Sequence, residues 1–443
     1  MSLRLLESLL TTEPLAEIFS DRTLLAAMLR FEAALARAEA GAGTIPATAA
    51  EVIATAAQSS RFEAAAIARA ARQSATIAIP LVDSLRARVA NFDRAAATFV
   101  HWGATSQDLV DTALVLCLAG AAPILQADHT RLRDALRRLS DSHARTIMLG
   151  RTLLQPAPPI TFGLKAAGWF ASVSRAGAEV FSALERTRVL QFGGAAGTLA
   201  ALGSDGPRVA ADLASELGLQ NAGAPWHAQR DRLGSLVAAC GVYCGTLGKI
   251  ARDVSLLMQF EVKEAAEPGG GSSSMPHKRN PAGCAVALAA ATHVPGLVAA
   301  FLAGMPQEHE RGVGGWQAEG ATVAATVQAT GAALSSIADA VSGLVVDPER
   351  MRANLAATHG VVFAERAMVL LAPTLGRAAA RRIIEGAVSA ASTGEATFAQ
   401  ALGANADAAR VLAASELATL DSPEAYLGAA EEFRKTLLAD DDQ

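Results

Sequence analysis

Cysteine is scarce in this chain, with four residues among 443. A disulfide scaffold is therefore excluded, and a reducing compartment, the cytoplasm, is expected. Cys240 and Cys244 lie one helical turn apart, but no Cys or His nearby completes a metal site, so buried packing is the better interpretation. Phosphate-loop and dinucleotide motifs are also missing, because the glycine pair Gly312-x-Gly314 does not follow a strand-like run. The sequence predicts no metal and no cofactor.

An excess of positive charge is lacking as well, with 38 Lys and Arg against 43 Asp and Glu and a net charge of −5. This balance argues against a nucleic-acid partner, and the absence of a basic tract argues against binding to a membrane surface. Glu7 and Glu13 interrupt the apolar N-terminus, which has no small-residue cleavage site and is not typical of a signal peptide.

The mean hydropathy of +0.28 raises the question of a membrane span. Between Pro281 and Glu308 the chain has no charged residue, but it contains His293, Pro295 and several Gly and Thr. A lipid-facing span would be richer in Leu, Ile and Phe, so we expect a helix buried among other helices. The apolar excess then indicates large subunit interfaces.

Aromatic residues make up only 5% of the chain although 51% of it is hydrophobic, so alanine and leucine supply most of the apolar surface. Alanine is the best helix former, and its small size lets helices approach closely. Apolar residues recur in steps of three and four, whereas alternation with period two is scarce. The pattern predicts an all-α bundle with long helices at 128–146, 161–191, 234–264, 282–303 (interrupted near Pro295) and 318–342.

Two breaks divide the chain into three predicted domains. The segment at 105–108 separates shorter N-terminal helices from the long ones, and the turn at Val346-Asp347-Pro348 begins a C-terminal part of short helices. We expect an N-terminal helical domain over 1–110, a central long-helix domain over 111–347 and a C-terminal helical domain over 348–443. A chain of this length exceeds what one hydrophobic core usually supports.

The segment 267–281 reads EPGGGSSSMPHKRNP and combines flexibility with charge. Its three glycines resemble a hinge, and Asn280 before a proline is typical of a helix start. The loop within it, 268–281, thus delivers a serine and Lys278 beside a helix N-terminus, and both the lysine and the helix end favour negative charge. The alternative is a solvated glycine-serine linker with incidental charges.

The segment HWGATSQD, residues 101–108, places polar groups at another predicted helix start. Thr105 or Ser106 can cap that helix, with Asp108 in its first turn. Taken alone, this segment indicates no more than a capped helix.

The run GSSSMPHKRNP resembles the signature loop of the aspartase/fumarase superfamily, glycine-serine-x-x-methionine-x-x-lysine-x-asparagine, at every fixed position. The resemblance implies a three-domain fold with a central bundle of long helices that forms a tetramer core. It also implies that Ser272 carries the catalytic proton and that Lys278 and Asn280 bind and stabilise the intermediate.

Two other segments are similar to conserved regions of the same superfamily. The similarity of 101–108 implies that Thr105 and Ser106 bind a substrate carboxylate and that His101 is a polar contact. In the segment GRTLLQPAPP, residues 150–159, Gln155 matches a conserved glutamine and is a further substrate contact. Because the three regions come from different subunits in the superfamily, the resemblance implies a homotetramer with shared active sites.

Leu153 departs from the superfamily, because lyases usually have a histidine acid at this position. Hydroxide and amine leaving groups need a proton before they depart. A carboxylate is stable as an anion above about pH 4 and needs none. Leu153 therefore predicts lactone chemistry, in which a substrate carboxylate adds to a conjugated double bond and the enolate is protonated at carbon.

The lactone-forming cycloisomerases of the superfamily likewise lack that histidine, and this chain resembles them at 225–232, at 307–316 and from Gly343 to Asn354. The resemblance implies a small substrate with three carboxylates. Arg230, Arg279 and Arg311 lie in or near these segments and are expected to bind it, although many arginines in any protein are solvated or paired with acids.

Two other functions stay open. His101 and the run MPHKRNP also occur in adenylosuccinate lyases, so a C–N lyase that releases fumarate is an alternative, against which Leu153 argues. The other is a non-catalytic structural protein, like the crystallins recruited from this superfamily. The intact set of Ser272, Lys278 and Asn280 argues against such a loss of function.

Overall fold

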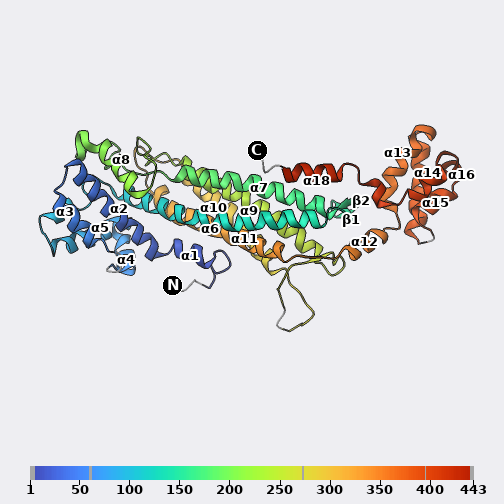
Figure 1. The fold of residues 1–443 in the computed structure, drawn as a ribbon, viewed down its shortest axis with the longest axis horizontal. Coiled ribbons are helices and arrows are strands. Elements are labelled where there is room, and N and C mark those ends of the chain that lie inside the picture. Colours follow the sequence, from blue (N-terminus) through green and yellow to red (C-terminus); the bar gives the residue numbers. More distant parts are fainter. Residues whose placement is uncertain (1–4, 59–61, 272–273, 395, 440–443) are drawn as a thin grey trace. The chain divides into compact units, whose positions relative to one another are not determined.

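The computed structural model describes residues 5–58, 62–271, 274–394 and 396–439, which are mostly helical (Figure 1). The contacts divide the chain into two compact units. Unit 1 comprises Met1–Thr130, Arg175–Gly248 and Ala285–Ser336, and unit 2 comprises Arg131–Ser174, Lys249–Cys284 and Ile337–Gln443. The three-domain division stays a prediction. The two predicted breaks do coincide with helix starts, at Ser106 and Pro348.

Short helices form the N-terminal part of unit 1, where α2 packs against α3 and α8 (Figure 1). Ser20 caps α2 by accepting a hydrogen bond from the Thr23 backbone, and Gly43 ends the helix with a φ of 80°. The elements of this part are α1 (Glu13–Ile18), α2 (Asp21–Ala42), α3 (Ala47–Ala56), α4 (Ala64–Ser74), α5 (Ala78–Ala90), the 3₁₀ turns η2 (Ala96–Phe99) and η3 (Ala200–Asp205), and α8 (Gly206–Leu217).

The five predicted long helices are all present, and the all-α prediction is confirmed. They are α6 (Ser106–Ser142), α7 (Phe162–Thr187), α9 (Asp231–Leu257), α10 (Ala282–Gly304) and α11 (Gly315–Ser342). Several bounds differ from the prediction, since α7 ends at Thr187 and α9 ends at Leu257, earlier than the predicted 191 and 264. The helix expected from 128 already begins at Ser106 and continues through Pro123, and α10 continues through Pro295 where an interruption was expected.

Small residues allow close helix packing within unit 1. A Cβ on Gly177 of α7 would lie 2.1 Å from the His129 ring of α6, so only glycine fits there. The His129 Nδ1 lies 2.7 Å from the Tyr243 hydroxyl of α9. Cys240 and Cys244 of α9 are fully buried, as predicted. The absent side chain of Gly177 thus lets α7 pack closely against α6.

Helices α6, α9, α10 and α11 are each long and apolar enough to cross a membrane, judged by length and composition alone. In the most apolar windows of α6, α9 and α11, 56–61% of the residues are buried within the chain, but in α10 only 22% are. The charge-free stretch that we expected to be buried is therefore largely uncovered within one chain. Exposed apolar surface of this extent is typical of sites that contact another protein surface or a membrane.

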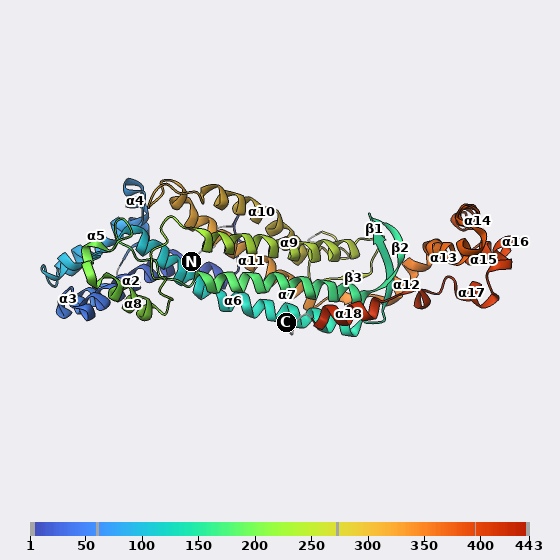
Figure 2. The same ribbon diagram turned by 90° about the horizontal axis from the view of Figure 1, so that it is seen from above.

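Unit 2 contains two small sheets and the C-terminal helices. Strands β1 (Ile147–Thr152) and β2 (Gln155–Thr161) form an antiparallel hairpin beside α12 (Figure 2), and β3 (Ala265–Ala266) pairs with β4 (Val345–Val346). The helical elements are α12 (Pro348–Ala356), η4 (Val361–Phe363), α13 (Ala364–Leu375), α14 (Arg377–Ser392), α15 (Phe398–Ala404), α16 (Ala406–Val411), α17 (Ala414–Thr419), η5 (Pro423–Tyr426) and α18 (Ala430–Ala439).

A separate apolar core holds the C-terminal helices together and reaches the hairpin. Ile147 and Leu149 of β1 belong to the same buried cluster as Phe363, Leu371 and Phe398. Because Ile147 and Leu149 at the start of β1 pack into this C-terminal core, the base of the hairpin is fixed. The turn at the other end of the hairpin lies beyond these packed residues.

Candidate active site

The Asp108 carboxylate organises the loop at the start of α6. One oxygen, Oδ2, accepts hydrogen bonds from the backbone N–H groups of Thr105 at 3.0 Å and Gly194 at 2.9 Å. The other, Oδ1, accepts from the Gly193 N–H at 3.0 Å and lies 2.7 Å from the His227 Nε2. The bond from the Thr105 N–H to Asp108 is the one that an acidic residue in the first helical turn makes in a capping box. Asp108 therefore fixes the backbone that carries the predicted carboxylate-binding residues.

Arg311 lies directly on the predicted carboxylate-binding pair. Its Nη1 donates to the Thr105 hydroxyl at 2.5 Å, and its Nε donates to the Gln107 side-chain oxygen at 3.4 Å. Among the residues that the structure describes, no carboxylate forms an ion pair with Arg311. Its positive charge therefore remains available to an anion beside Thr105. Ser106, the first residue of α6, is partly buried next to this pair.

His101 precedes this cluster in a left-handed backbone conformation, with a φ of 59°. Its Nδ1 lies 2.5 Å from a carboxylate oxygen of Glu32, which is buried in α2. Burial of the ring lowers the pKa of His101, but the charge and hydrogen bond of Glu32 outweigh that effect, so its pKa is raised overall. His101 thus gains a tendency to be cationic.

Arg230, which the sequence predicts as a substrate contact, is enclosed by protein carboxylates. Its side chain is fully buried, and its Nε donates to Glu319 at 2.8 Å while its Nη1 donates to Asp111 at 2.8 Å. Burial lowers the pKa of Arg230, but the two carboxylates raise it overall. The guanidinium also lies over the Trp226 ring, 4.8 Å from its centroid. Asp111 and Glu319 therefore neutralise the charge of this guanidinium.

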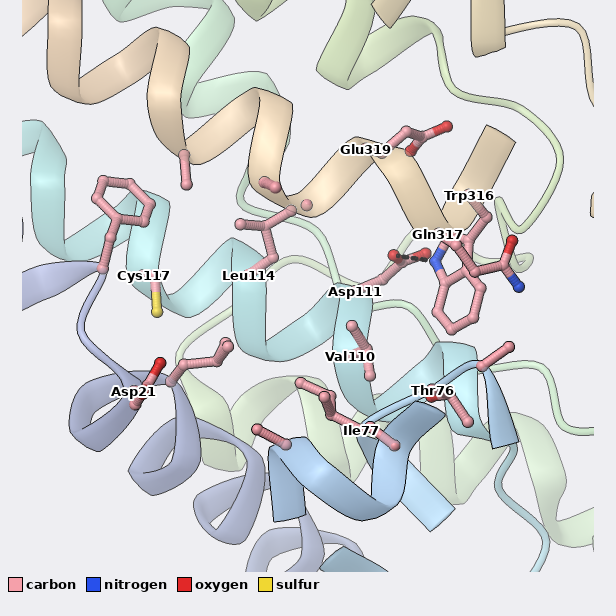
Figure 3. Close-up of a pocket in the computed structure, with 18 of the residues that line it drawn as sticks. Asp21, Thr76, Ile77, Val110, Asp111, Leu114, Cys117, Trp316, Gln317 and Glu319 are labelled. Carbon is pink, nitrogen blue, oxygen red and sulfur yellow. Dashed lines mark hydrogen bonds between the residues drawn. The ribbon is translucent and has the colours of Figure 1, made fainter. Parts of the chain in front are cut away.

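A cavity of about 580 Å³ adjoins the Arg230 cluster in unit 1. Figure 3 shows Asp111, Trp316 and Glu319 toward one end, and the rest of the lining mixes apolar side chains such as Leu114 and Ile77 with polar ones such as Asp21. The Trp316 indole donates to Asp111 at 2.9 Å. Arg230 is the one predicted site residue that lines this cavity. At this end of the cavity Asp111, Glu319 and Arg230 already bind one another, so this cluster offers no unpaired cation to a tricarboxylate.

The predicted signature loop belongs to unit 2, and its base is closed by close backbone contact. The Asn280 N–H donates to the Gly270 carbonyl at 2.6 Å, and a Cβ on Gly270 would lie 1.8 Å from the Asn280 carbonyl oxygen. Only glycine permits this approach. Lys278 and Arg279 are exposed, and among the described residues neither forms an ion pair. Ser272, the predicted proton carrier, lies outside the described residues.

The N-terminus of α10 corrects one expectation about this loop. Its first free N–H groups, on Gly283 and Cys284, donate to the two carboxylate oxygens of Glu267 at 2.8 and 3.1 Å. Glu267 is buried, with 2% of its surface exposed. The helix end that we expected to stabilise substrate charge is therefore already occupied by a protein carboxylate.

Leu153 and Leu154 form the two-residue turn of the β1–β2 hairpin. Their φ angles are 51° and 64°, and their exposed fractions are 95% and 78%. Such turns favour Asn-Gly because both residues need positive φ. Two leucines here are strained and solvent-exposed within the chain, which is a feature of functional sites. Gln155 follows at the start of β2 and is also exposed.

The hairpin is anchored by a bidentate ion pair next to this turn. The Arg151 guanidinium donates to both oxygens of the buried Glu264, at 2.9 and 2.7 Å. The Asn354 side chain of α12 donates to the same carboxylate at 2.8 Å. Asn354, the last residue of the family-like segment that begins at Gly343, therefore has a structural role in holding Glu264. Arg352, two residues earlier, forms an ion pair with Glu424.

Sequence reasoning missed the roles of three carboxylates at these sites. The motifs assign Asp108 only a capping role and assign Glu267 none. Glu32 belongs to no motif, although a charged residue on the buried face of α2 is a signal that the helical period could have revealed. Glu32 contacts His101 and Asp108 binds the Thr105 backbone, whereas Glu267 binds the helix start that follows Asn280.

Comparison with known proteins establishes the family. The family described as "Lyase" matches residues 9–296, and the family described as "Adenylosuccinate lyase C-terminus" matches residues 360–437. The chain belongs to this family of lyases, the fumarate lyase superfamily, as its fold and signature loop predict.

Individual members of this family are similar to the chain over nearly its whole length. A 3-carboxy-cis,cis-muconate cycloisomerase of Bradyrhizobium diazoefficiens is 46% identical over 98% of this chain and 97% of its own length. The crystal structure of the 3-carboxy-cis,cis-muconate lactonizing enzyme from Pseudomonas putida has a TM-score of 0.92 and 42% identity, with 99% of each chain covered. A nitrosuccinate lyase of Streptomyces davaonensis is 41% identical over 94% of this chain and 90% of its own length.

Proposed function

We propose that this chain is a cofactor-independent cycloisomerase that converts 3-carboxy-cis,cis-muconate to 4-carboxymuconolactone, in the protocatechuate branch of the β-ketoadipate pathway in the cytoplasm. The observation that carries the proposal is Leu153, which cannot protonate a leaving group, in a chain that retains the loop residues Lys278 and Asn280. The names of the relatives with full-length similarity agree with this reaction.

The proposed reaction forms one C–O bond and one C–H bond. An oxygen of one substrate carboxylate attacks the conjugated double bond, and the alkene electron pair moves toward the carboxylate that is conjugated with it. The resulting enolate takes a proton at carbon from Ser272, which is thus a general acid. Lys278 stabilises the enolate charge, and Asn280 binds it. No proton has to reach the attacking oxygen, because a carboxylate carries its charge without one.

Binding of the tricarboxylate is proposed to rely on Arg311, Thr105 and Ser106 in unit 1. The Arg311 guanidinium has no carboxylate partner among the described residues, and its contact with Thr105 presents a cation and a hydroxyl side by side. The exposed Arg279 and Gln155 of unit 2 are proposed as further contacts. Arg230 is assigned a structural role instead, because Asp111 and Glu319 neutralise it.

The substrate assignment predicts that the purified protein consumes 3-carboxy-cis,cis-muconate. The measurement is the loss of diene absorbance, with the lactone identified by NMR. A second candidate is elimination from nitrosuccinate, which the nitrosuccinate lyase relative favours. The leaving group of nitrosuccinate is nitrite, an anion that needs no proton, so Leu153 is compatible with this reaction too.

Parallel assays separate these reactions. Nitrite release from nitrosuccinate at a higher kcat/KM than muconate turnover would select the second candidate. Efficient fumarate release from adenylosuccinate would contradict both, because an amine leaving group needs an acid that Leu153 does not provide.

We further propose a homotetramer with active sites shared between subunits. The support is α10, whose surface is apolar and largely uncovered within the chain, together with the exposed Leu302 of α10 and Val242 of α9, which are 46% and 67% exposed. Burial of such surface stabilises association by about 25 cal/mol per Å² of apolar area.

The variant Val242→Glu is expected to dissociate the tetramer and to abolish activity, because each buried glutamate would lack a partner. Multi-angle light scattering gives the mass, and the diene assay gives the activity. Val369→Glu is the matched control, since Val369 is 65% exposed on the C-terminal helix α13. A wild-type protein that is monomeric and active would contradict the shared site.

A further inference from the structure

Two carboxyl groups are buried behind His101. Glu32 and Glu39 lie two turns apart on α2, and their exposed fractions are 1% and 0%. Most residues on that face of the helix are apolar. Among the described residues, no hydrogen-bond partner reaches either oxygen of Glu39 or the Oε2 of Glu32. Burial of a carboxylate destabilises the fold unless the group is paired or protonated. Two buried glutamates on one helix therefore suggest a function for at least one of them.

The two carboxyl groups differ in their partners, because Glu32 contacts His101 while Glu39 has no hydrogen-bond partner among the described residues. Burial raises the pKa of Glu39 to about 9, and the neighbouring Glu32 adds to the increase. Glu39 is therefore a neutral acid at pH 7. The single ion pair of the cluster joins Glu32 to His101, through the 2.5 Å contact between Oε1 and Nδ1.

The backbone at His101 directs the ring toward Glu32 at some cost. A φ of 59° is unfavourable for a residue with a side chain, although His, Asn and Asp tolerate it better than most. With Nδ1 held by Glu32, the other nitrogen, Nε2, has no hydrogen-bond partner among the described residues. The ring therefore has one donor fixed and one donor free, four residues before Thr105.

We propose that Glu32 is a positioning residue that holds His101 as an imidazolium whose free Nε2–H binds a carboxylate of the substrate. The inference rests on the proposed function and deepens it. It adds His101, whose charge depends on pH, to Thr105 and Arg311 as a residue that binds a substrate carboxylate. The charged groups that act on the ring are Glu32 of α2, Asp108 of α6 and Arg86 of α5. The first two favour the cation and Arg86 opposes it.

This proposal predicts a specific change in pH dependence. An imidazolium is present below its pKa, so the wild-type kcat/KM falls as the pH rises through the raised pKa of His101. In Glu32→Gln the charge that raised this pKa is lost while the burial that lowers it remains. The fall should then occur about one to three pH units lower. Diene-assay profiles between about pH 5 and pH 9 measure the shift.

Two further variants make the test specific. Glu39→Gln replaces a neutral acid by a neutral amide of the same shape, so its profile should match that of the wild type. His101→Asn preserves a residue that tolerates positive φ, and its profile should lack the His101-dependent fall. A Glu32→Gln profile that is uniformly lower but not shifted would indicate a merely structural role and would overturn the proposal. Persistence of the fall in His101→Asn would overturn it too.

A measurement without substrate separates this inference from the proposed function. Diethylpyrocarbonate modifies neutral imidazole, and peptide mass spectrometry reports the extent of modification at His101 as a function of pH. The midpoint should be lower in Glu32→Gln than in the wild type. If that shift is observed but the wild type does not consume the muconate, the proposed function fails and the Glu32–His101 pair stands. If the midpoint is unshifted in an enzyme that consumes the muconate, the proposed function stands and the role of Glu32 is refuted.

Discussion

Replacement of Ser272 by alanine should lower kcat by about 10²- to 10⁴-fold, the range expected for loss of a general acid. The melting temperature should stay the same, because the change removes one hydroxyl from a loop whose neighbouring residues are exposed. The expectation rests on the position of this serine in the run GSSSMPHKRNP and on the proposed protonation of an enolate at carbon. Stopped-flow and steady-state diene assays measure the effect.

Ser274 is the matched control, since it lies two residues further along the same loop and is exposed. The Ser274→Ala variant should retain nearly full activity. Equal losses in both variants would indicate that the loop needs hydroxyl groups for its conformation. An unchanged kcat in Ser272→Ala would assign the proton to another residue.

Much of the fold follows from the sequence because long helices leave a strong periodic signal. Each of the five predicted long helices exists, and the breaks at Ser106 and Pro348 coincide with helix starts. The ends of α7 and α9 are shorter than predicted, and two further differences concern proline. A local rule ends helices at this residue, yet α6 and α10 continue through Pro123 and Pro295. Packing against neighbouring helices outweighs a single lost hydrogen bond, and a local pattern does not contain that information.

The motifs also located candidate site residues, but they did not reveal which charges are already neutralised. Arg230 and Arg311 are equally plausible cations in the sequence. The structure separates them, because Arg230 is enclosed by two carboxylates while Arg311 contacts a hydroxyl and an amide. Likewise, the asparagine-proline start of α10 was correctly located to within a residue, but the buried carboxylate of Glu267 at that helix end depends on tertiary contacts. Local sequence patterns cannot predict which charged groups, far apart in the sequence, pair with one another in the fold.

The variant Arg230→Met should be destabilised by about 3–5 kcal/mol, the usual consequence of removing one partner from a buried ion pair. Asp111 and Glu319, each 3% exposed, would be left as uncompensated buried carboxylates. Urea unfolding followed by circular dichroism measures the change in the free energy of unfolding. Arg311→Met is the contrasting variant. It should raise KM and change stability little, because the Arg311 side chain is only partly buried and neutralises no carboxylate among the described residues.

The pH dependence of the Arg230→Met variant tests the same idea with a defined sign. Burial already raises the pKa of Glu319 with Arg230 beside it, and loss of the guanidinium would raise it further. A carboxyl group whose pKa is higher in the folded than in the unfolded state contributes stability at low pH, and this contribution is lost as the pH rises through the folded-state value. The stability deficit of the variant should therefore be smaller at pH 5 than at pH 8. If the variant instead has wild-type stability at both pH values and a strongly raised KM, the structural role of Arg230 is wrong and Arg230 binds the substrate.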